Sequence, residues 1–138
     1  MAELTRKEAR ETAFCLLLET EFHGMDDPKT VYETAVENRE IADDAYVKQI
    51  YFGVREHLAE LDALMEKHSK GWKVSRISPV SRSVLRLCIY EMLYREDIPC
   101  AVSLNEAIEL VKKYDDEKMR PFVNGLLNGV KNELEAAQ

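Results

Sequence analysis

The segment 79–114, PVSRSVLRLCIYEMLYREDIPCAVSLNEAIELVKKY, decides the fold of this chain. All but two of the ten positions from Val84 to Leu93 are apolar, whereas a helix at a protein surface keeps one polar face. A helix that is apolar all round has to be surrounded by other helices, so we expect this segment to be the central helix of the protein. Ser78 and Pro79 are typical of its start, and Pro99 is typical of the end of the region.

Further helices are indicated on both sides of this segment. Five stretches carry a capping residue or a proline followed by apolar residues at steps of three and four, which is the helical repeat. They are expected to begin near Thr5, Asp27, Asp43 or Asp44, Ser103 and Pro121. The third is expected to continue as one long helix to Gly71. No stretch alternates apolar and polar residues as a half-buried strand does.

The predicted fold class is therefore all-α, with two small antiparallel helical bundles packed as one domain and about six or seven helices. A chain of 138 residues has the usual length of a single domain. A turn near Gly24 or near Gly71 can divide it. We expect one domain over residues 1–138, with subdomains of approximately 1–71 and 72–138.

Composition excludes several classes of protein. The apolar runs are shorter than the roughly 18 residues that indicate a membrane span, and the charged start MAELTRKEAR differs from a signal peptide. We therefore expect a cytoplasmic protein that does not contact membranes. The cysteines are too far apart for a CxxC pair and the histidines form no HExxH motif, so no metal or other cofactor is expected.

Enzymatic motifs are also missing from the sequence. It contains no glycine-rich phosphate loop and no GxSxG motif. Glu91 is the one acid embedded in the apolar helix, where a hydrogen bond or an ion pair with Arg95 explains it better than catalysis does. We predict that the protein is not an enzyme.

Charge is distributed unevenly along the chain. The formal net charge of −7 disfavours indiscriminate binding to nucleic acid. Between Lys67 and Tyr90, however, no acidic residue occurs while six basic residues do. These are Lys67, Lys70, Lys73, Arg76, Arg82 and Arg86. Trp72 lies among them and Phe122 follows later, and such mixtures of cations and aromatic rings are typical of surfaces that bind single-stranded RNA.

Plainer interpretations of this segment stay open. A lone tryptophan such as Trp72 more often anchors a core than stacks on a base. Phe122 is likewise a core or rim residue in this interpretation. Arg82 and Arg86 are also typical of anchors in a protein interface.

A second group of cations lies at the start of the first predicted helix. Arg6 and Arg10 are four residues apart with Lys7 beside them, and their charges are expected to be exposed. A helix N-terminus adds free amides and the positive end of the helix dipole, which suits phosphate. The alternative is that nearby acids such as Glu3 or Glu11 neutralise these arginines on an ordinary solvated helix end.

A family resemblance is carried by TRKEARETA (5–13), RSVLRLCIYEMLYREDIPCAVSLNEAIELVKKY (82–114) and FVNGLLNGV (122–130). These runs resemble the NusB family of bacterial transcription antitermination factors. The resemblance implies an all-helical fold of two small subdomains and a role without catalysis. Members bind the boxA element of nascent RNA together with the ribosomal protein NusE, and they help polymerase to read through terminators, notably in ribosomal RNA operons.

The resemblance also implies site residues. RNA contacts are implied for the first helix and for the turn before FVNG, and the basic segment contributes two further candidates. The candidate RNA-binding residues are Arg6, Lys7, Arg10, Lys73, Arg76, Lys118 and Phe122. The partner surface, formed in the family by the first helix and the central helix, is implied at Leu18, Phe22, Ser81 and Arg86.

Four positions depart from the family pattern. Glu8 interrupts the basic start of the first helix, Leu18 stands where an aromatic residue can occur, and Ser81 stands where an acidic or otherwise charged residue is common. Asp115 replaces a frequent glycine in the turn after KKY. These departures concern the RNA affinity of the first helix, the contacts with the partner and the approach to Phe122.

Three functions are compatible with these observations. The leading hypothesis is an antitermination factor that binds boxA-like single-stranded RNA with NusE, within an elongation complex that contains other Nus factors. The alternative is a helical protein–protein adaptor, or a homodimer, with little intrinsic RNA binding. The third is the RNA-recognition domain of a ribosomal RNA methyltransferase, although this chain is too short to hold a catalytic domain as well.

Overall fold

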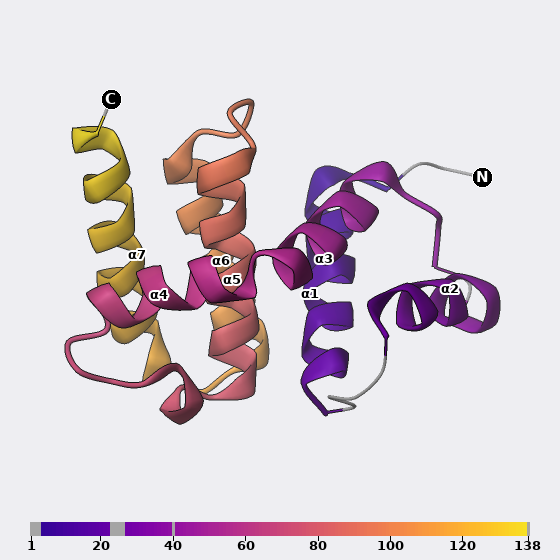
Figure 1. Ribbon diagram of the computed structural model, residues 1–138, viewed down its shortest axis with the longest axis horizontal. Coiled ribbons are helices and arrows are strands. Elements are labelled where there is room, and N and C mark those ends of the chain that lie inside the picture. Colours follow the sequence, from indigo (N-terminus) through magenta and orange to yellow (C-terminus); the bar gives the residue numbers. More distant parts are fainter. Residues whose placement is uncertain (1–3, 23–26, 40, 138) are drawn as a thin grey trace. The chain divides into compact units, whose positions relative to one another are not determined.

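The computed structural model describes residues 4–22, 27–39 and 41–137, and these residues form seven α-helices and no strand (Figure 1). The helices are α1 (Arg6–Phe22), α2 (Pro28–Arg39), α3 (Ala45–Glu56), α4 (Leu58–His68), α5 (Pro79–Tyr94), α6 (Cys100–Tyr114) and α7 (Met119–Ala136), with the 3₁₀ turn η1 (Val74–Arg76) between α4 and α5. The all-α prediction is confirmed. Across the described ranges, no helix combines the length and the apolarity needed to cross a membrane.

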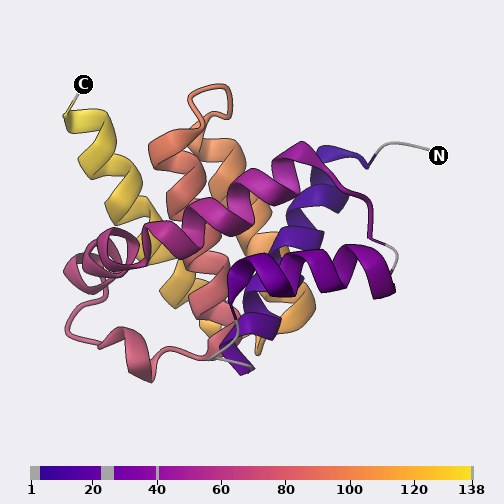
Figure 2. The ribbon, with the colours of Figure 1, turned by 45° about the vertical axis from the view of Figure 1, so that its right-hand side comes forward.

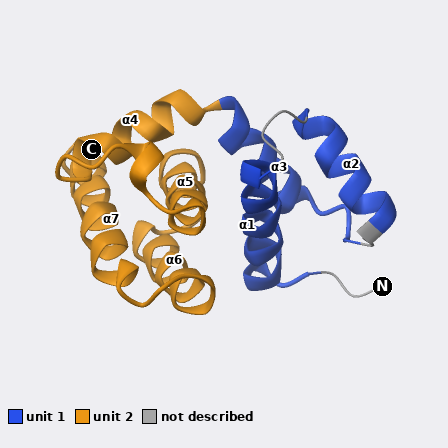
Figure 3. Ribbon diagram, turned by 90° about the horizontal axis from the view of Figure 1, so that it is seen from below, with its two compact units in different colours: residues 1–56 blue, residues 57–138 orange. Residues whose placement is uncertain are grey.

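The chain consists of two compact units, residues 1–56 and residues 57–138 (Figure 3). The sequence pattern predicts subdomains of approximately 1–71 and 72–138, because its apolar repeat indicates one helix where the structure has α3 and α4. The structure ends α3 at Glu56 and begins α4 at Leu58, and the backbone of His57 (φ −109°, ψ 21°) leaves helical geometry between them. Apolar residues recur at steps of three and four on both sides of this break, so the sequence pattern does not reveal it.

Unit 1 contains α1, α2 and α3, which contact one another (Figure 2). The predicted capping box at the start of α1 is confirmed, since the Glu8 amide donates to Thr5 Oγ1 at 3.0 Å and the Thr5 amide donates to Glu8 Oε1 at 2.9 Å. Phe14 and Tyr51 are fully buried in the core. Thr20 Oγ1 lies 2.6 Å from the Tyr51 hydroxyl, so this buried phenol has a hydrogen-bond partner.

Unit 2 is built around α5, which contacts α4, α6 and α7. Nine of its residues are buried, among them Leu85 and Ile89 with no exposed surface, so the predicted central helix is confirmed. Glu91 is also fully buried and accepts a hydrogen bond from Ser103 Oγ at 2.7 Å. The predicted helix start at Ser103 is wrong, because α6 already begins at Cys100 and uses the Ser103 hydroxyl inside the core instead of as a cap.

The packing of α4 on α7 depends on Gly129, which has no side chain beyond a hydrogen atom. A Cβ atom added at Gly129 would lie 2.5 Å from His68 Nδ1, whereas a Cβ at Gly125, one turn earlier on α7, would have no atom within 4 Å. His68 Nε2 also lies 2.8 Å from Glu133 Oε1, so the imidazole is held on α7 at both ends. His68 is therefore a packing residue between α4 and α7.

Alanine at these two glycines is expected to change stability in opposite directions. Gly125→Ala should raise the free energy of unfolding by up to about 1 kcal/mol, because alanine favours the helix and meets no neighbour. Gly129→Ala should lower it by about 1–3 kcal/mol, because the imidazole of His68 has to move. Urea denaturation followed by circular dichroism measures both values, and equal stability of the two variants would contradict the close approach at Gly129.

Candidate nucleic-acid interface

The cationic start of α1 is only partly exposed. Arg6 and Lys7 are exposed, as predicted. Arg10 is not, since only 3 % of its surface is accessible. The guanidinium carbons of Arg6 and Arg10 lie 4.5 Å and 5.8 Å from the centre of the Tyr46 ring on α3. The expectation that Arg10 projects past the core is therefore wrong, because this side chain is used to pack α1 against α3.

The connection between α4 and α5 is held by its own side chains. Ser69 Oγ donates to the carbonyl oxygens of Glu66 and Trp72 at 3.1 and 2.5 Å. Arg82 Nη1 donates to the carbonyl oxygens of Val74 and Ile77 at 3.2 and 3.1 Å. The turn before η1 also needs positive φ angles, 55° at Lys70 and 94° at Gly71. The connection is therefore an ordered turn.

This turn presents a mixed cationic and aromatic surface. Lys70, Lys73 and Arg76 are exposed on it, and Trp72 has 55 % of its surface accessible, although a core position was the more common expectation. Arg82 is turned inward, because its guanidinium supports the carbonyl groups of η1.

The start of α7 completes this surface. The Phe122 ring lies 6.4 Å from the Trp72 ring at 70°, an edge-to-face arrangement. The two rings line a hollow of about 290 Å³ together with His68 of α4, Lys70 of the turn that follows it and Gly125 of α7. Lys118 is exposed one turn before Phe122. We call the group Lys70, Trp72, Lys73, Arg76, Lys118 and Phe122 the Trp72–Phe122 surface.

Ser81 does not lie on a partner surface. It is fully buried, and its hydroxyl donates to Asp115 Oδ2 at 2.5 Å. Ser78 Oγ donates to the same oxygen at 2.7 Å, and the Asp116 amide donates to Asp115 Oδ1 at 2.7 Å. Burial alone would raise the pKa of Asp115, but the hydrogen bonds from Ser81, Ser78 and backbone amides outweigh it and hold the pKa below its usual value.

Arg86 is also committed within unit 2. Its Nε and Nη2 atoms donate to the two carboxylate oxygens of Asp62 at 2.8 and 2.9 Å, and only 12 % of its side chain is accessible. This bidentate pair joins α5 to α4. Of the four predicted partner residues, Ser81 and Arg86 thus have structural roles.

The remaining two partner candidates lie near the end of α1. Leu18 is half-buried and Phe22, the last residue of the helix, has 69 % of its surface accessible. An aromatic side chain exposed to this degree is typical of a residue that anchors a protein partner. The structure therefore leaves these two residues available for the predicted contact.

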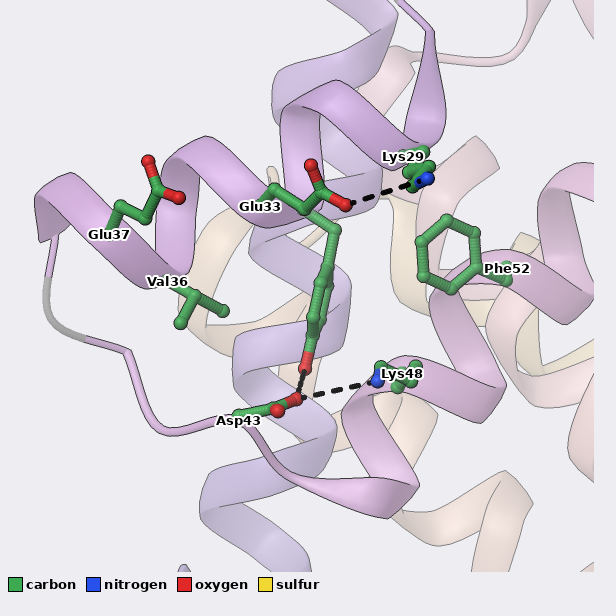
Figure 4. A pocket seen from close by; sticks show the side chains of 8 residues that line it. Lys29, Glu33, Val36, Glu37, Asp43, Lys48 and Phe52 are labelled. Carbon is green, nitrogen blue, oxygen red and sulfur yellow. Dashed lines mark hydrogen bonds and ion pairs between the residues drawn. The ribbon is translucent and has the colours of Figure 1, made fainter.

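A second concave region lies between α2 and α3 of unit 1 (Figure 4). It measures about 500 Å³, and its charged side chains largely pair with one another: Lys29 with Glu33 at 3.9 Å, and Lys48 with Asp43 at 3.7 Å. The Tyr32 hydroxyl also donates to Asp43 at 2.8 Å, and burial followed by this hydrogen bond raises the pKa of Tyr32 well above its usual value. These paired charges are less suited to RNA than the exposed cations of the Trp72–Phe122 surface.

Comparison with known proteins places this geometry in a family. A family model described as "NusB family" matches residues 7–132. The chain belongs to the NusB family. A NusB family protein of Bacillus pumilus, named transcription antitermination protein NusB, is 42 % identical over 131 residues, which cover 95 % of this chain and 98 % of the relative. A relative of the same name from Ruminiclostridium cellulolyticum is 46 % identical over 124 residues, covering 88 % of this chain and 85 % of the relative.

Solved NusB structures share the fold. The structure of NusB from T. maritima matches with a TM-score of 0.86 and 32 % identity, over 96 % of this chain and 94 % of that chain. A chain in the crystal structure of the antitermination factors NusB and NusE in complex with dsRNA matches with a TM-score of 0.81 and 32 % identity, over 93 % of this chain and 96 % of that chain. The recognition of the NusB family from sequence is confirmed.

Proposed function

We propose that this NusB family member is a transcription antitermination factor that binds boxA-like single-stranded RNA in nascent ribosomal RNA transcripts. We further propose that it does so together with ribosomal protein NusE, in an elongation complex with other Nus factors. Relatives over 40 % identical are named transcription antitermination protein NusB, and a matching solved complex contains NusB, NusE and dsRNA. The observation that carries the proposal is the exposed Trp72–Phe122 surface.

The chemistry of this surface favours a single strand. Lys73, Arg76 and Lys118 are exposed cations that can contact successive phosphates. The accessible ring of Trp72, beside Phe122, offers a face on which unpaired bases can stack. Bases inside a duplex are already stacked and cannot use these rings, so duplex RNA would gain only the phosphate contacts.

Unit 1 supplies two further elements of the proposal. Arg6 and Lys7 are exposed beside the N-terminus of α1, so they can bind phosphate, whereas Arg10 supports the position of α1 through Tyr46. Phe22 at the other end of α1 is the proposed anchor for NusE.

Titration of fluorescently labelled RNA tests this function. Single-stranded boxA-like RNA should bind more tightly than the same sequence in a duplex, and added NusE should increase its affinity. With about four phosphate contacts on a single strand, raising salt from about 50 to 200 mM should weaken binding about 50-fold. Duplex RNA that binds as tightly as the single strand, or binding that is independent of salt, would contradict the proposal and favour the protein adaptor.

A further inference from the structure

We propose that Asp115 is a positioning residue, which fixes the two halves of the Trp72–Phe122 surface relative to each other. The first half is the turn that carries Trp72, Lys73 and Arg76, and the second is the start of α7 with Lys118 and Phe122. The inference rests on the proposed function, because it explains how this chain arranges a surface that we assign to RNA.

The contacts of Asp115 lie between the two halves. Asp115 is the C-terminal cap residue of α6, and its Oδ2 accepts hydrogen bonds from Ser78 and Ser81 at 2.7 and 2.5 Å. Ser78 is the N-terminal cap of α5, and its hydroxyl also accepts from the Ser81 amide at 3.1 Å. One carboxylate oxygen thus joins the end of α6 to the residue that follows η1 and Ile77.

The second carboxylate oxygen of Asp115, Oδ1, is connected by hydrogen bonds to the start of α7. The Asp116 amide donates to Asp115 Oδ1 at 2.7 Å, and the Lys118 amide donates to Asp116 Oδ1 at 3.0 Å. Lys118 is the cap residue of α7 and lies one turn before Phe122. A chain of hydrogen bonds therefore runs from the basic turn through Asp115 to Lys118.

The contacts between the halves include the Asp115 hydrogen bonds and the ring contact between Trp72 and Phe122. A ring that stacks on a base has to move freely enough to accept it, so the ring contact is a poor fixed point during binding. The hydrogen bonds of Asp115 involve no atom of either ring, so they keep both halves in register when a base arrives. Pre-organisation of this kind increases affinity by lowering the entropy lost on binding.

Asp115 does not act through its charge on RNA. A carboxylate near phosphates would repel them, and both of its oxygens accept hydrogen bonds from protein donors. Removing the side chain is therefore expected to weaken RNA binding despite the loss of a negative charge, which is the opposite of the electrostatic expectation. A glycine at this position could not make these bonds, because they use the Asp115 carboxylate.

The test compares Asp115→Ala with Glu117→Ala, which removes the same charge from an exposed neighbour whose side chain pairs with Arg120 at 3.6 Å. Asp115→Ala should weaken binding of single-stranded boxA-like RNA about tenfold, with unchanged helicity, whereas Glu117→Ala should leave it unchanged or strengthen it. In a Lys73→Ala, Arg76→Ala background, Asp115→Ala should have less than a twofold effect, because one half of the surface is already lost.

Fluorescence of Trp72, the single tryptophan of the chain, gives a readout without RNA. Acrylamide should quench Trp72 more strongly in Asp115→Ala than in Glu117→Ala, because the turn is released. Wild-type RNA affinity in Asp115→Ala, or an equal loss in the Lys73→Ala, Arg76→Ala background, overturns the inference. Wild-type protein that binds no RNA overturns the proposed function. In that case, equal quenching of Trp72 in Asp115→Ala and Glu117→Ala would overturn the positioning role as well. Stronger quenching in Asp115→Ala would support the positioning role.

Discussion

Charge reversal at Lys73 and Arg76 together is expected to weaken binding of single-stranded boxA-like RNA about 100-fold. Both side chains are exposed on the turn that carries Trp72. Two unit charges about 4 Å apart in water interact by about 1 kcal/mol, so reversing two phosphate contacts costs on the order of 4 kcal/mol before screening. Screening by salt removes part of this energy, which leaves the expected weakening of about 100-fold.

Fluorescence anisotropy of labelled RNA measures this loss for Lys73→Glu, Arg76→Glu. The slope of the logarithm of affinity against the logarithm of salt concentration should also fall by about 1.4, because two contacts with a single strand are lost. A control with the same change in net charge is Lys29→Glu, Lys112→Glu, whose lysines form only exposed pairs with Glu33 and Glu109. Equal losses in both double variants would show that net charge alone, and no local surface, governs RNA binding.

The fold was predictable because its main signals are local. The apolar run of α5 identifies a buried central helix, and Thr5 with Glu8 identifies the start of α1 from four consecutive residues. The break at His57 was not predictable, because the apolar repeat continues through it. The start of α6 was misplaced for a related reason: the Ser103 hydroxyl serves a buried partner, Glu91, and a cap and a core hydroxyl look alike in sequence.

The candidate site was predictable by residue type but not by exposure. Sequence locates the candidate residues, yet it does not tell which of their side chains face solvent, because their partners lie elsewhere in the chain. Arg86 pairs with Asp62, Arg10 packs on Tyr46, and Ser81 bonds to Asp115. The exposure of a long side chain thus depends on tertiary contacts that local spacing does not contain.

In the sequence, Asp115 stands out only as a departure from the family pattern. Its signal in the sequence was the replacement of a frequent glycine, which suggested an altered approach to Phe122. Its hydrogen bonds with Ser78 and Ser81 could not be inferred, because they join the end of α6 to the start of α5 across 37 and 34 residues of chain. Such a departure becomes interpretable once the partners of the new side chain are known.

Phe22→Ala is expected to reduce the affinity for NusE about 100-fold while leaving the free energy of unfolding nearly unchanged. Phe22 has 69 % of its surface accessible, so its removal exposes little of the core of unit 1. In an interface, by contrast, truncation of an aromatic anchor costs about 2–4 kcal/mol. Half-buried Leu18 is one turn earlier on α1, so Leu18→Ala should cost less in binding and more in stability.

Isothermal titration calorimetry with purified NusE measures the effect, and urea denaturation measures stability. Val102→Ala is the matched control, because Val102 is an exposed apolar residue of α6 with 43 % of its surface accessible. Trp72→Ala should show the reverse specificity, with weakened RNA binding and wild-type affinity for NusE. Wild-type affinity for NusE in Phe22→Ala would remove this end of α1 from the interface. A wild-type dimer that Phe22→Ala converts to a monomer would instead assign the exposed ring to self-association, since an aromatic anchor serves either kind of interface.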